Sequence, residues 1–376
     1  MLRSALDLLI ETDWNRAGKE VLSLIITPHR VNPPSQEELS GLVEAFKASP
    51  AVQGLYSDAD RSNLLYLPRW RHVELCCDVS ADLKRIFLPH DSSARLQEFL
   101  QQVSASQVFE HDVRVVVRSR HGGILSLPWE LLLLREDEPS LFTGLKFQLV
   151  RCLVGFGVTE TPLDSVLCGI TGASRLGNVP NPNQSRCHFF GSPVTLSAIT
   201  GHKRLSRPAA FVLAADRSSE GFCLDDNETP IRRPRFDSNC PCSVAAESLV
   251  SLLGNTSALC FCALVVCRCC QQALTLLQEN PSMRASLGLK SNTTKTGSRH
   301  LLNWLLHALT REMAVDEVLL EYRKQAFYAQ TNEWPGGWRD WWSPTLFSKS
   351  IEAAFAFKAR GRMFDRIFHW RHPYAI

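Results

Sequence analysis

The sequence predicts an α/β protein with a mostly parallel sheet between two layers of helices, and three observations support this fold class. Short continuous apolar runs bounded by loops recur along the chain, as is typical of strands buried on both faces of a parallel sheet. Amphipathic segments with helical spacing alternate with these runs. The chain has 376 residues, 45% hydrophobic and 21% charged, which is enough for one large or two ordinary globular domains.

The first 70 residues predict a small helical segment. Leu6, Leu9 and Ile10 have the spacing of one helix face. After a polar stretch with two prolines, residues 36–48 form a second amphipathic pattern. We expect residues 1–70 to pack on the main domain as helices, and a helical module that recruits a partner is the alternative.

The main domain is expected over residues 71–346, in two halves. The first half, 71–160, contains three predicted strands and one predicted helix: strands over 72–79, 112–119 and 146–155, and a helix over 95–106. Pro128 suits the first turn of a further helix. The second half, 161–346, is expected to continue the sheet with strands over 166–171, 209–215, 221–226 and 259–267. Helical patterns lie between and after them, at 194–202, 243–253, 300–313 and 314–327.

The N-terminal residues and the apolar runs predict a cytoplasmic protein. Asp7, Glu11 and Asp13 interrupt the uncharged core that a signal peptide needs. No apolar run approaches the roughly 18–20 residues that span a bilayer. The net charge of +3 is too small to predict nucleic-acid binding by itself.

Thirteen cysteines raise the question of disulfides or a metal site. An odd number without a secretory signal argues against a disulfide framework. The spacings at 240–242, 260–262 and 267–270 differ from the paired CxxC or CxxH knuckles of zinc sites. Neither GxGxxG nor GxxxxGK[S/T] occurs, so a nucleotide loop is not predicted. We therefore expect no metal and no cofactor.

Chemistry is expected where parallel strands end, because sites in such folds lie beyond the carboxyl ends of the strands. Two predicted ends carry reactive side chains: Asp216 follows one strand, and Cys269 and Cys270 follow the 259–267 strand. Cys270 also precedes a segment that can open a helix, and a helix N-terminus can lower the pKa of a thiol. Cys270 is therefore the candidate nucleophile, and Cys267 and Cys269 are predicted to be core or near-core thiols.

Five segments occur in the order found in a known family. They are LSLPWELLLL with the following LFTGLKFQLVRCL, then FVLAADRSSEGFCLDD, then AAESLVSLL before ALVVCRCCQQAL, then the region from RASLGLKS to residue 325, and finally DWWSPTLFS. Together they resemble the CHAT group of caspase-like cysteine peptidases, relatives of separase and the caspases. The resemblance covers about residues 72–347. It implies a caspase-like αβα fold and places Cys270 at the position of the catalytic cysteine.

The sequence departs from this family at the catalytic base. The family's histidine falls on Asp216, and the glycine after it falls on Arg217. A carboxylate with a pKa of about 4 is a poor base for a thiol with a pKa of about 8.5. His188, His202 and His300 are the alternative bases, but none lies at the expected position in the alignment.

Arg268, Cys269 and Arg217 are candidates for lining a peptide pocket, because the resemblance implies that this neighbourhood holds the residue before the cut. The Arg268 guanidinium would favour acidic side chains there through bidentate pairing. The simpler interpretation is that Arg268 is half-buried at the strand end and neutralises Asp216 or another nearby acid.

The C-terminal residues 347–376 mix aromatic and basic side chains. We expect a terminal helix that packs on the domain through its phenylalanines. The same composition can bind nucleic acid, an anionic membrane surface or a partner protein, so these alternatives stay open.

The missing histidine favours a catalytically degenerate homologue that acts as a protein-interaction or regulatory module with a protein or peptide partner. The resemblance implies a bacterial defence or signalling assembly as its setting. The alternative is an active cysteine endopeptidase that uses Cys270 with an atypical base.

Overall fold

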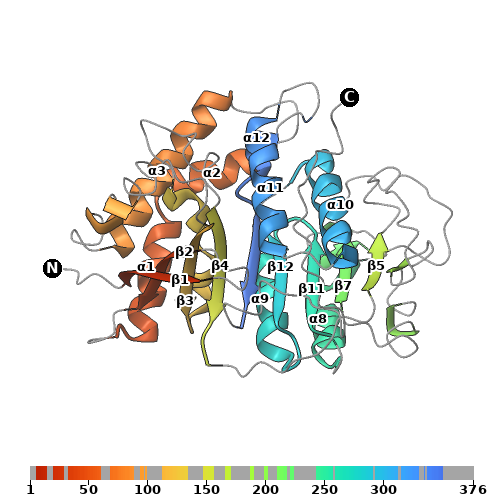
Figure 1. The fold of residues 1–376 in the computed structure, drawn as a ribbon. Coiled ribbons are helices and arrows are strands. Elements are labelled where there is room, and N and C mark those ends of the chain that lie inside the picture. Colours follow the sequence, from red (N-terminus) through yellow and green to blue (C-terminus); the bar gives the residue numbers. More distant parts are fainter. Residues whose placement is uncertain are drawn as a thin grey trace.

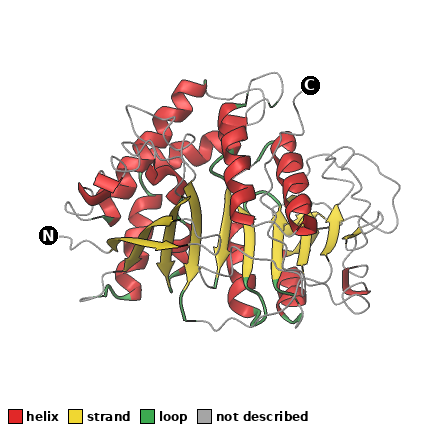
Figure 2. Ribbon diagram, viewed as in Figure 1, coloured by secondary structure: helices red, strands yellow, loops and turns green. Residues whose placement is uncertain are grey.

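A ten-stranded sheet runs through the molecule, with helices on both of its faces (Figure 1, Figure 2). The predicted fold class, an α/β protein with a mostly parallel sheet, is confirmed. The computed structural model describes residues 6–14, 20–28, 33–60, 68–88, 94–96, 98–99, 112–133, 147–155, 166–170, 187–189, 199–201, 210–217, 221–223, 243–256, 259–290, 293–311, 315–329, 334 and 337–349.

The large sheet contains two groups of parallel strands. Its members are β1 Leu6–Trp14, β2 Glu20–Pro28, β3 Asp112–Ser119, β4 Phe147–Leu153, β5 Val166–Ile170, β6 Cys187–Phe189, β7 Ala210–Ala214, β11 Phe261–Val265, β12 Ala285–Leu289 and β13 Pro344–Ser348. Across the sheet they follow the order β1-β2-β3-β4-β13-β12-β11-β7-β5-β6. The antiparallel pairs are β1–β2 and β12–β13, so the chain direction reverses in the middle of the sheet.

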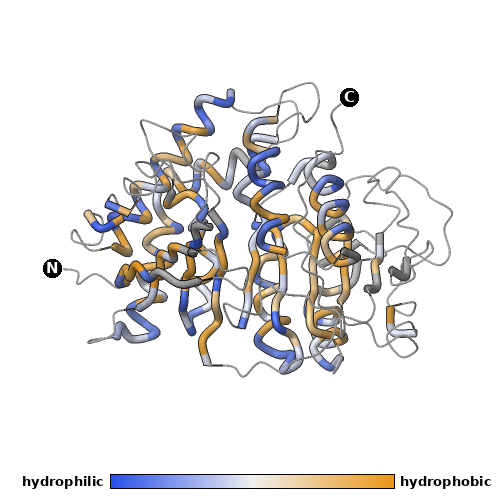
Figure 3. The backbone as a smooth tube through the Cα atoms, viewed as in Figure 1, coloured by the Kyte–Doolittle hydropathy of each residue, from blue (hydrophilic) through white to orange (hydrophobic). Residues whose placement is uncertain are grey.

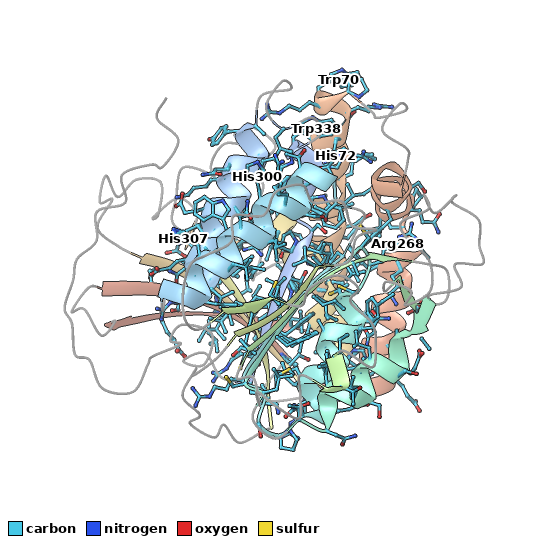
Figure 4. All side chains as sticks on the ribbon, turned by 90° about the vertical axis from the view of Figure 1, so that its right-hand side faces the viewer. Trp70, His72, Arg268, His300, His307 and Trp338 are labelled. Carbon is cyan, nitrogen blue, oxygen red and sulfur yellow. The ribbon has the colours of Figure 1, made fainter. Side chains whose placement is uncertain are left out.

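Helices on opposite faces sandwich this sheet. They are α1 Gln36–Lys47, α2 Pro50–Asp60, α3 Arg69–Phe87, α5 Gly122–Ser126, the 3-10 helix η1 Trp129–Leu133, α8 Ala246–Gly254, α9 Cys270–Glu279, α10 Lys295–Arg311, α11 Val315–Tyr328 and α12 Gly337–Asp340. Figure 4 views the sheet from its side and shows α8 and α9 on one face and α10 and α11 on the other.

The prediction of a helical segment for residues 1–70 is wrong over its first 30 residues. β1 and β2 form an antiparallel hairpin, and β2 continues into the main sheet through parallel pairing with β3. Leu6 and Leu8 are buried on one face, and this two-residue spacing is that of a strand. A short apolar run can satisfy both helical and strand spacing, and here the pairing with β3 decides in favour of the strand.

The helix predicted over 36–48 is confirmed as α1. Ser35 and Glu38 form a capping box, in which each side chain accepts a hydrogen bond from the other residue's backbone N–H, at 3.1 and 2.8 Å.

The strand predicted over 72–79 is also wrong, because these residues belong to α3. The buried side chains on α3 recur at three- and four-residue intervals: His72, Cys76, Val79, Ser80, Leu83 and Phe87. This spacing places them on one side of a helix, whereas a strand would have exposed half of them.

The other predicted elements of the main domain mostly lie where expected. β3, β4, β5, β7 and β11 confirm five predicted strands, and α8, α10 and α11 confirm three predicted helices. The prediction for 221–226 needs correction, because β9 Gly221–Cys223 belongs to a separate three-stranded sheet with β8 Asp216–Arg217 and β10 Ser243–Ala245. The sequence did not predict β12 and β13, although both are central strands.

The core follows the central strands. Every residue of β7, β11, β12 and β13 is buried. β7 and β11 consist entirely of apolar residues, and hydrophobic colouring marks the central strands in Figure 3. Residues 347 and 348 of the predicted tail lie in β13, and the helix expected further along the tail lies outside the described residues. Within the described part of the chain, none of the helices combines the length and the apolar character needed to cross a bilayer.

Candidate functional site

The two strand ends that carry the predicted site residues lie side by side. β7 and β11 are neighbouring parallel strands, and Ala214 is paired with Val265 at their carboxyl ends. The backbone of Asp216 and Arg217 enters β8 two residues beyond β7, and the Cys267–Cys270 turn follows β11. Both segments therefore leave the sheet at the same end of these two parallel strands. The side chains of Asp216 and Arg217 lie outside the described part of the structure.

The turn after β11 has an unusual backbone at Arg268. Its φ of 56° lies in the left-handed region, which costs an L-residue about 1–2 kcal/mol. The Arg268 side chain is exposed (Figure 4), so the expectation of a half-buried guanidinium is wrong. The left-handed residue reverses the chain so that α9 can begin two residues later, at Cys270.

Cys269 is a core thiol. Its Sγ donates a hydrogen bond to the Leu264 carbonyl at 3.0 Å and accepts one from the Leu289 N–H at 3.4 Å. Burial raises the pKa of this thiol to about 12, against the smaller opposing effect of the backbone hydrogen bonds. A thiol with such a pKa is protonated at neutral pH and is a weak nucleophile.

Cys270 opens α9 and is buried, with 8% of its surface exposed. Burial raises the pKa of its thiol, and this effect outweighs the lowering by Lys290, by Arg151 and by a hydrogen bond with the Thr345 side chain. Glu130 acts in the same direction as burial, so the groups that act on Cys270 come from η1, β4, β13 and the end of β12, all inside the protein. The predicted benefit of a helix N-terminus does not overcome burial here.

A close approach of α9 to β12 holds both thiols in place. Gly288 lies so near the start of α9 that a Cβ atom there would be 2.8 Å from the Cys270 Cα and 2.9 Å from the Cys269 carbonyl oxygen. On the same face of β12, the Ser286 hydroxyl donates to the Ala273 carbonyl at 2.7 Å. Small residues on β12 therefore allow the helix to seat directly on the sheet.

The most strongly charged feature near Cys270 is a buried cluster around Glu130, which the sequence did not single out. One Glu130 oxygen accepts hydrogen bonds from Arg151 Nη2 and Lys290 Nζ, both at 2.7 Å, and the other accepts from Arg323 Nη2 at 3.1 Å. The four side chains are at most 2% exposed. They come from η1, β4, the end of β12 and α11, so the cluster ties together segments from both halves of the chain.

Burial and the neighbouring charges shift the pKa values of Glu130, Lys290 and Arg323. Burial acts to raise the pKa of Glu130, but Arg151, Lys290 and Arg323 outweigh it and lower the pKa to about 2. Burial and the neighbouring Arg151 lower the pKa of Lys290 to about 7. Burial also lowers the pKa of Arg323 to about 10. A carboxylate held by three cations is thus firmly ionised, and removing it would leave buried charges without a partner.

The sequence does contain a signal for this cluster. Glu130 interrupts the apolar run LPWELLLL, and Arg151 interrupts the strand FQLVRCL. A charge inside a segment expected to be buried indicates a paired charge, because isolated buried ions are too costly. Lys290 and Arg323 carry no comparable signal.

Of the three histidines considered as a replacement base, only His300 has a described side chain, and it does not lie beside Cys270. His300 lies on α10, across the sheet from α9, and stacks on Trp334 with ring centroids 4.7 Å apart (Figure 4). Burial, with a smaller effect of Arg299, lowers its pKa. The backbone of His188 lies in the edge strand β6, its side chain is outside the described part, and His202 is outside it altogether.

Among the described residues, no three His, Cys, Asp or Glu side chains come together as metal ligands. The nine cysteines whose side chains the structure describes form no disulfide with one another.

The comparisons with known proteins rest on structure and not on sequence. No family model and no curated protein matches the chain. Among solved structures, it is similar to a chain in the crystal structure of the Saccharomyces cerevisiae separase–securin complex, with 11% identity and a TM-score of 0.37. The match covers 82% of this chain and 22% of that one.

Proposed function

We propose that this protein is a caspase-like homologue that does not cleave peptides and instead acts as a protein-interaction or regulatory module. The observation that carries the proposal is the burial of the candidate nucleophile, Cys270, together with its neighbour Cys269, after β11. The CHAT resemblance supplies the broader context: a protein or peptide partner, and a bacterial defence or signalling assembly.

A working cysteine peptidase needs a thiol that reaches the substrate and a base that removes its proton. The groups that perturb Cys270 are Lys290, Arg151, Thr345 and Glu130, and none of them is an imidazole. Substitution of the family's histidine by Asp216 points in the same direction. Burial and the lost base therefore support loss of hydrolysis independently of each other.

A peptide-hydrolysis assay tests this proposal. The full chain is incubated with a casein digest and a fluorogenic peptide library at pH 6 to 8.5, beside Cys270→Ala and Cys269→Ala variants. We expect the same background release for all three. Hydrolysis by the wild type that Cys270→Ala abolishes would overturn the proposal.

One observation favours the alternative, an active endopeptidase with an atypical base. Lys290 has a pKa lowered to about 7, chiefly by burial, and its charge acts on Cys270. An amine with that pKa could take up a proton near neutral pH. Against this, Lys290 Nζ already donates to Glu130 at 2.7 Å inside the protein. Hydrolysis lost in both Lys290→Met and Cys270→Ala, but kept in a Lys324→Met control on the surface of α11, would establish the alternative.

A further inference from the structure

β4 and β13 separate toward their N-terminal ends. β13 pairs with β12 along its full length, but within the described strands it meets β4 at two positions alone, Phe347–Arg151 and Ser348–Cys152. The Glu130 cluster lies where the two strands diverge. Arg151 comes from β4, and Arg323 reaches the first residue of β13, where its Nη2 donates to the carbonyl of residue 344 at 2.9 Å. Side chains thus take the place of a backbone ladder at this point of the sheet.

The Glu130 cluster holds more positive than negative charge. Arg151, Lys290 and Arg323 share one carboxylate, and all four side chains are at most 2% exposed. The pKa of Lys290 is lowered to about 7, chiefly by burial, yet two guanidinium groups still share one carboxylate when Lys290 is neutral. Asp316 also acts on Arg323, but burial raises the pKa of Asp316 and so disfavours its charged form. An excess of buried charge is costly unless a counter-ion neutralises it.

Several buried nitrogen atoms of this region lack an acceptor within the described structure. Arg151 uses Nη2 to donate to Glu130 and to the Leu127 carbonyl, whereas its Nε and Nη1 have no hydrogen-bond partner. The indole Nε1 of Trp342, in the turn before β13, has none either, although Trp342 is fully buried. Such groups are rare and indicate an ordered water or an ion. Since these atoms are all donors beside excess positive charge, an anion would satisfy them better than water.

Tyr56 of α2 connects Trp342 with Arg151. Its ring packs edge-on against the Trp342 ring, with the centroids 5.6 Å apart. Burial raises the pKa of Tyr56, Cys270 and Glu130 act in the same direction, and Arg151 opposes them. The Tyr56 hydroxyl therefore lies near these charges and stays protonated, so it can serve as a further donor.

We propose that a small monovalent inorganic anion, such as chloride, binds between Arg151, Trp342 and Tyr56 and neutralises the excess charge of the Glu130 cluster. The buried surroundings favour a small ion, and an excess of one to two charges favours a monovalent one. The bound ion would help to hold β4 and β13 together where their backbone pairing ends. This inference does not depend on whether Cys270 hydrolyses peptides.

Thermal unfolding of the full chain at pH 7 tests this site, with potassium chloride replacing potassium gluconate at constant ionic strength. The melting temperature should rise with chloride and level off as the site fills, because gluconate is too large to enter it. Trp342→Phe removes the indole donor and keeps a ring beside Tyr56, so it should weaken the chloride affinity about tenfold. The matched control is Trp70→Phe on α3, where the side chain is 66% exposed, and this change should leave the affinity unchanged.

Tyr56→Phe is a second variant that removes a single hydroxyl and keeps the shape of the side chain. It should weaken the chloride affinity by a similar factor. Equal melting temperatures of the wild type in chloride and in gluconate would overturn the inference, because water would then satisfy the donors. A chloride effect of the same size in the wild type, in Trp342→Phe and in Tyr56→Phe would also overturn it, since the ion would then bind elsewhere.

Discussion

Glu130→Gln should destabilise this protein strongly, because it removes the carboxylate that three buried cations share. The amide can still accept hydrogen bonds but carries no charge, so Arg151, Lys290 and Arg323 would be left without a counter-ion. Breaking a buried ion pair by removing one partner costs about 3–5 kcal/mol. At about 2.1 cal/mol/K per residue, unfolding of the 376-residue chain has an entropy of about 0.8 kcal/mol/K, so that cost lowers the melting temperature by roughly 4–6 °C.

Thermal and urea unfolding monitored by circular dichroism measure this effect. Glu44→Gln on α1 is the matched control, because Glu44 pairs with Lys47 while 69% of its side chain is exposed. That change should cost at most about 0.5 kcal/mol. The double variant Glu130→Gln with Lys290→Met should be more stable than Glu130→Gln alone, since it removes one unpaired cation. A melting temperature for Glu130→Gln equal to that of Glu44→Gln would refute this account of the cluster.

Two further predictions concern pH and packing. Burial lowers the pKa of Lys290 from 10.5 to about 7 in the folded protein, so above about pH 7 the unfolded chain binds a proton that the folded chain does not. The free energy of unfolding should therefore rise with pH between about pH 7 and 10. Urea titrations at several pH values should show this rise in the wild type and its loss in Lys290→Met. An equal rise in Lys290→Met would contradict the lowered pKa of Lys290. Gly288→Ala should cost about 1–3 kcal/mol, because the new methyl group would meet the backbone of α9 at 2.8 Å. Gly41→Ala in α1, where nothing lies within 4 Å, should instead stabilise the protein by up to about 1 kcal/mol, and equal effects at the two glycines would argue against the close contact.

Local patterns predicted those elements whose residues show a single periodicity. β7 and β11 are continuous buried runs, and α10 repeats apolar residues at helical spacing, so each was predicted within a few residues. β1 and α3 were mistaken because their short apolar segments fit two periods, and tertiary pairing or packing decided between them. The sequence did not predict β12, because two of its buried residues, Ser286 and Gly288, are not hydrophobic. Their small size allows α9 to pack closely on this strand.

The candidate site was predictable only in part. The order of segments placed Asp216 and Cys270 after two strands, and the structure places those strands next to each other. The depth of the thiols could not be predicted, because it depends on how closely α9 approaches β12. The Glu130 cluster gathers residues separated by up to 193 positions, and single-sequence patterns do not carry such distant pairings.

Iodoacetamide labelling of the native protein at pH 8, followed by peptide mass mapping, tests the central claim most directly, because it reports the access and ionisation of each thiol. Cys267, half-buried in the same turn, serves as the internal reference. If Cys269 and Cys270 are buried at the start of α9, both should react with iodoacetamide at least about a hundredfold more slowly than Cys267. Their rate would then be limited by local opening of the structure. Labelling of Cys270 faster than Cys267 would reveal an open, activated thiol and would contradict the account of a protein that has lost hydrolysis.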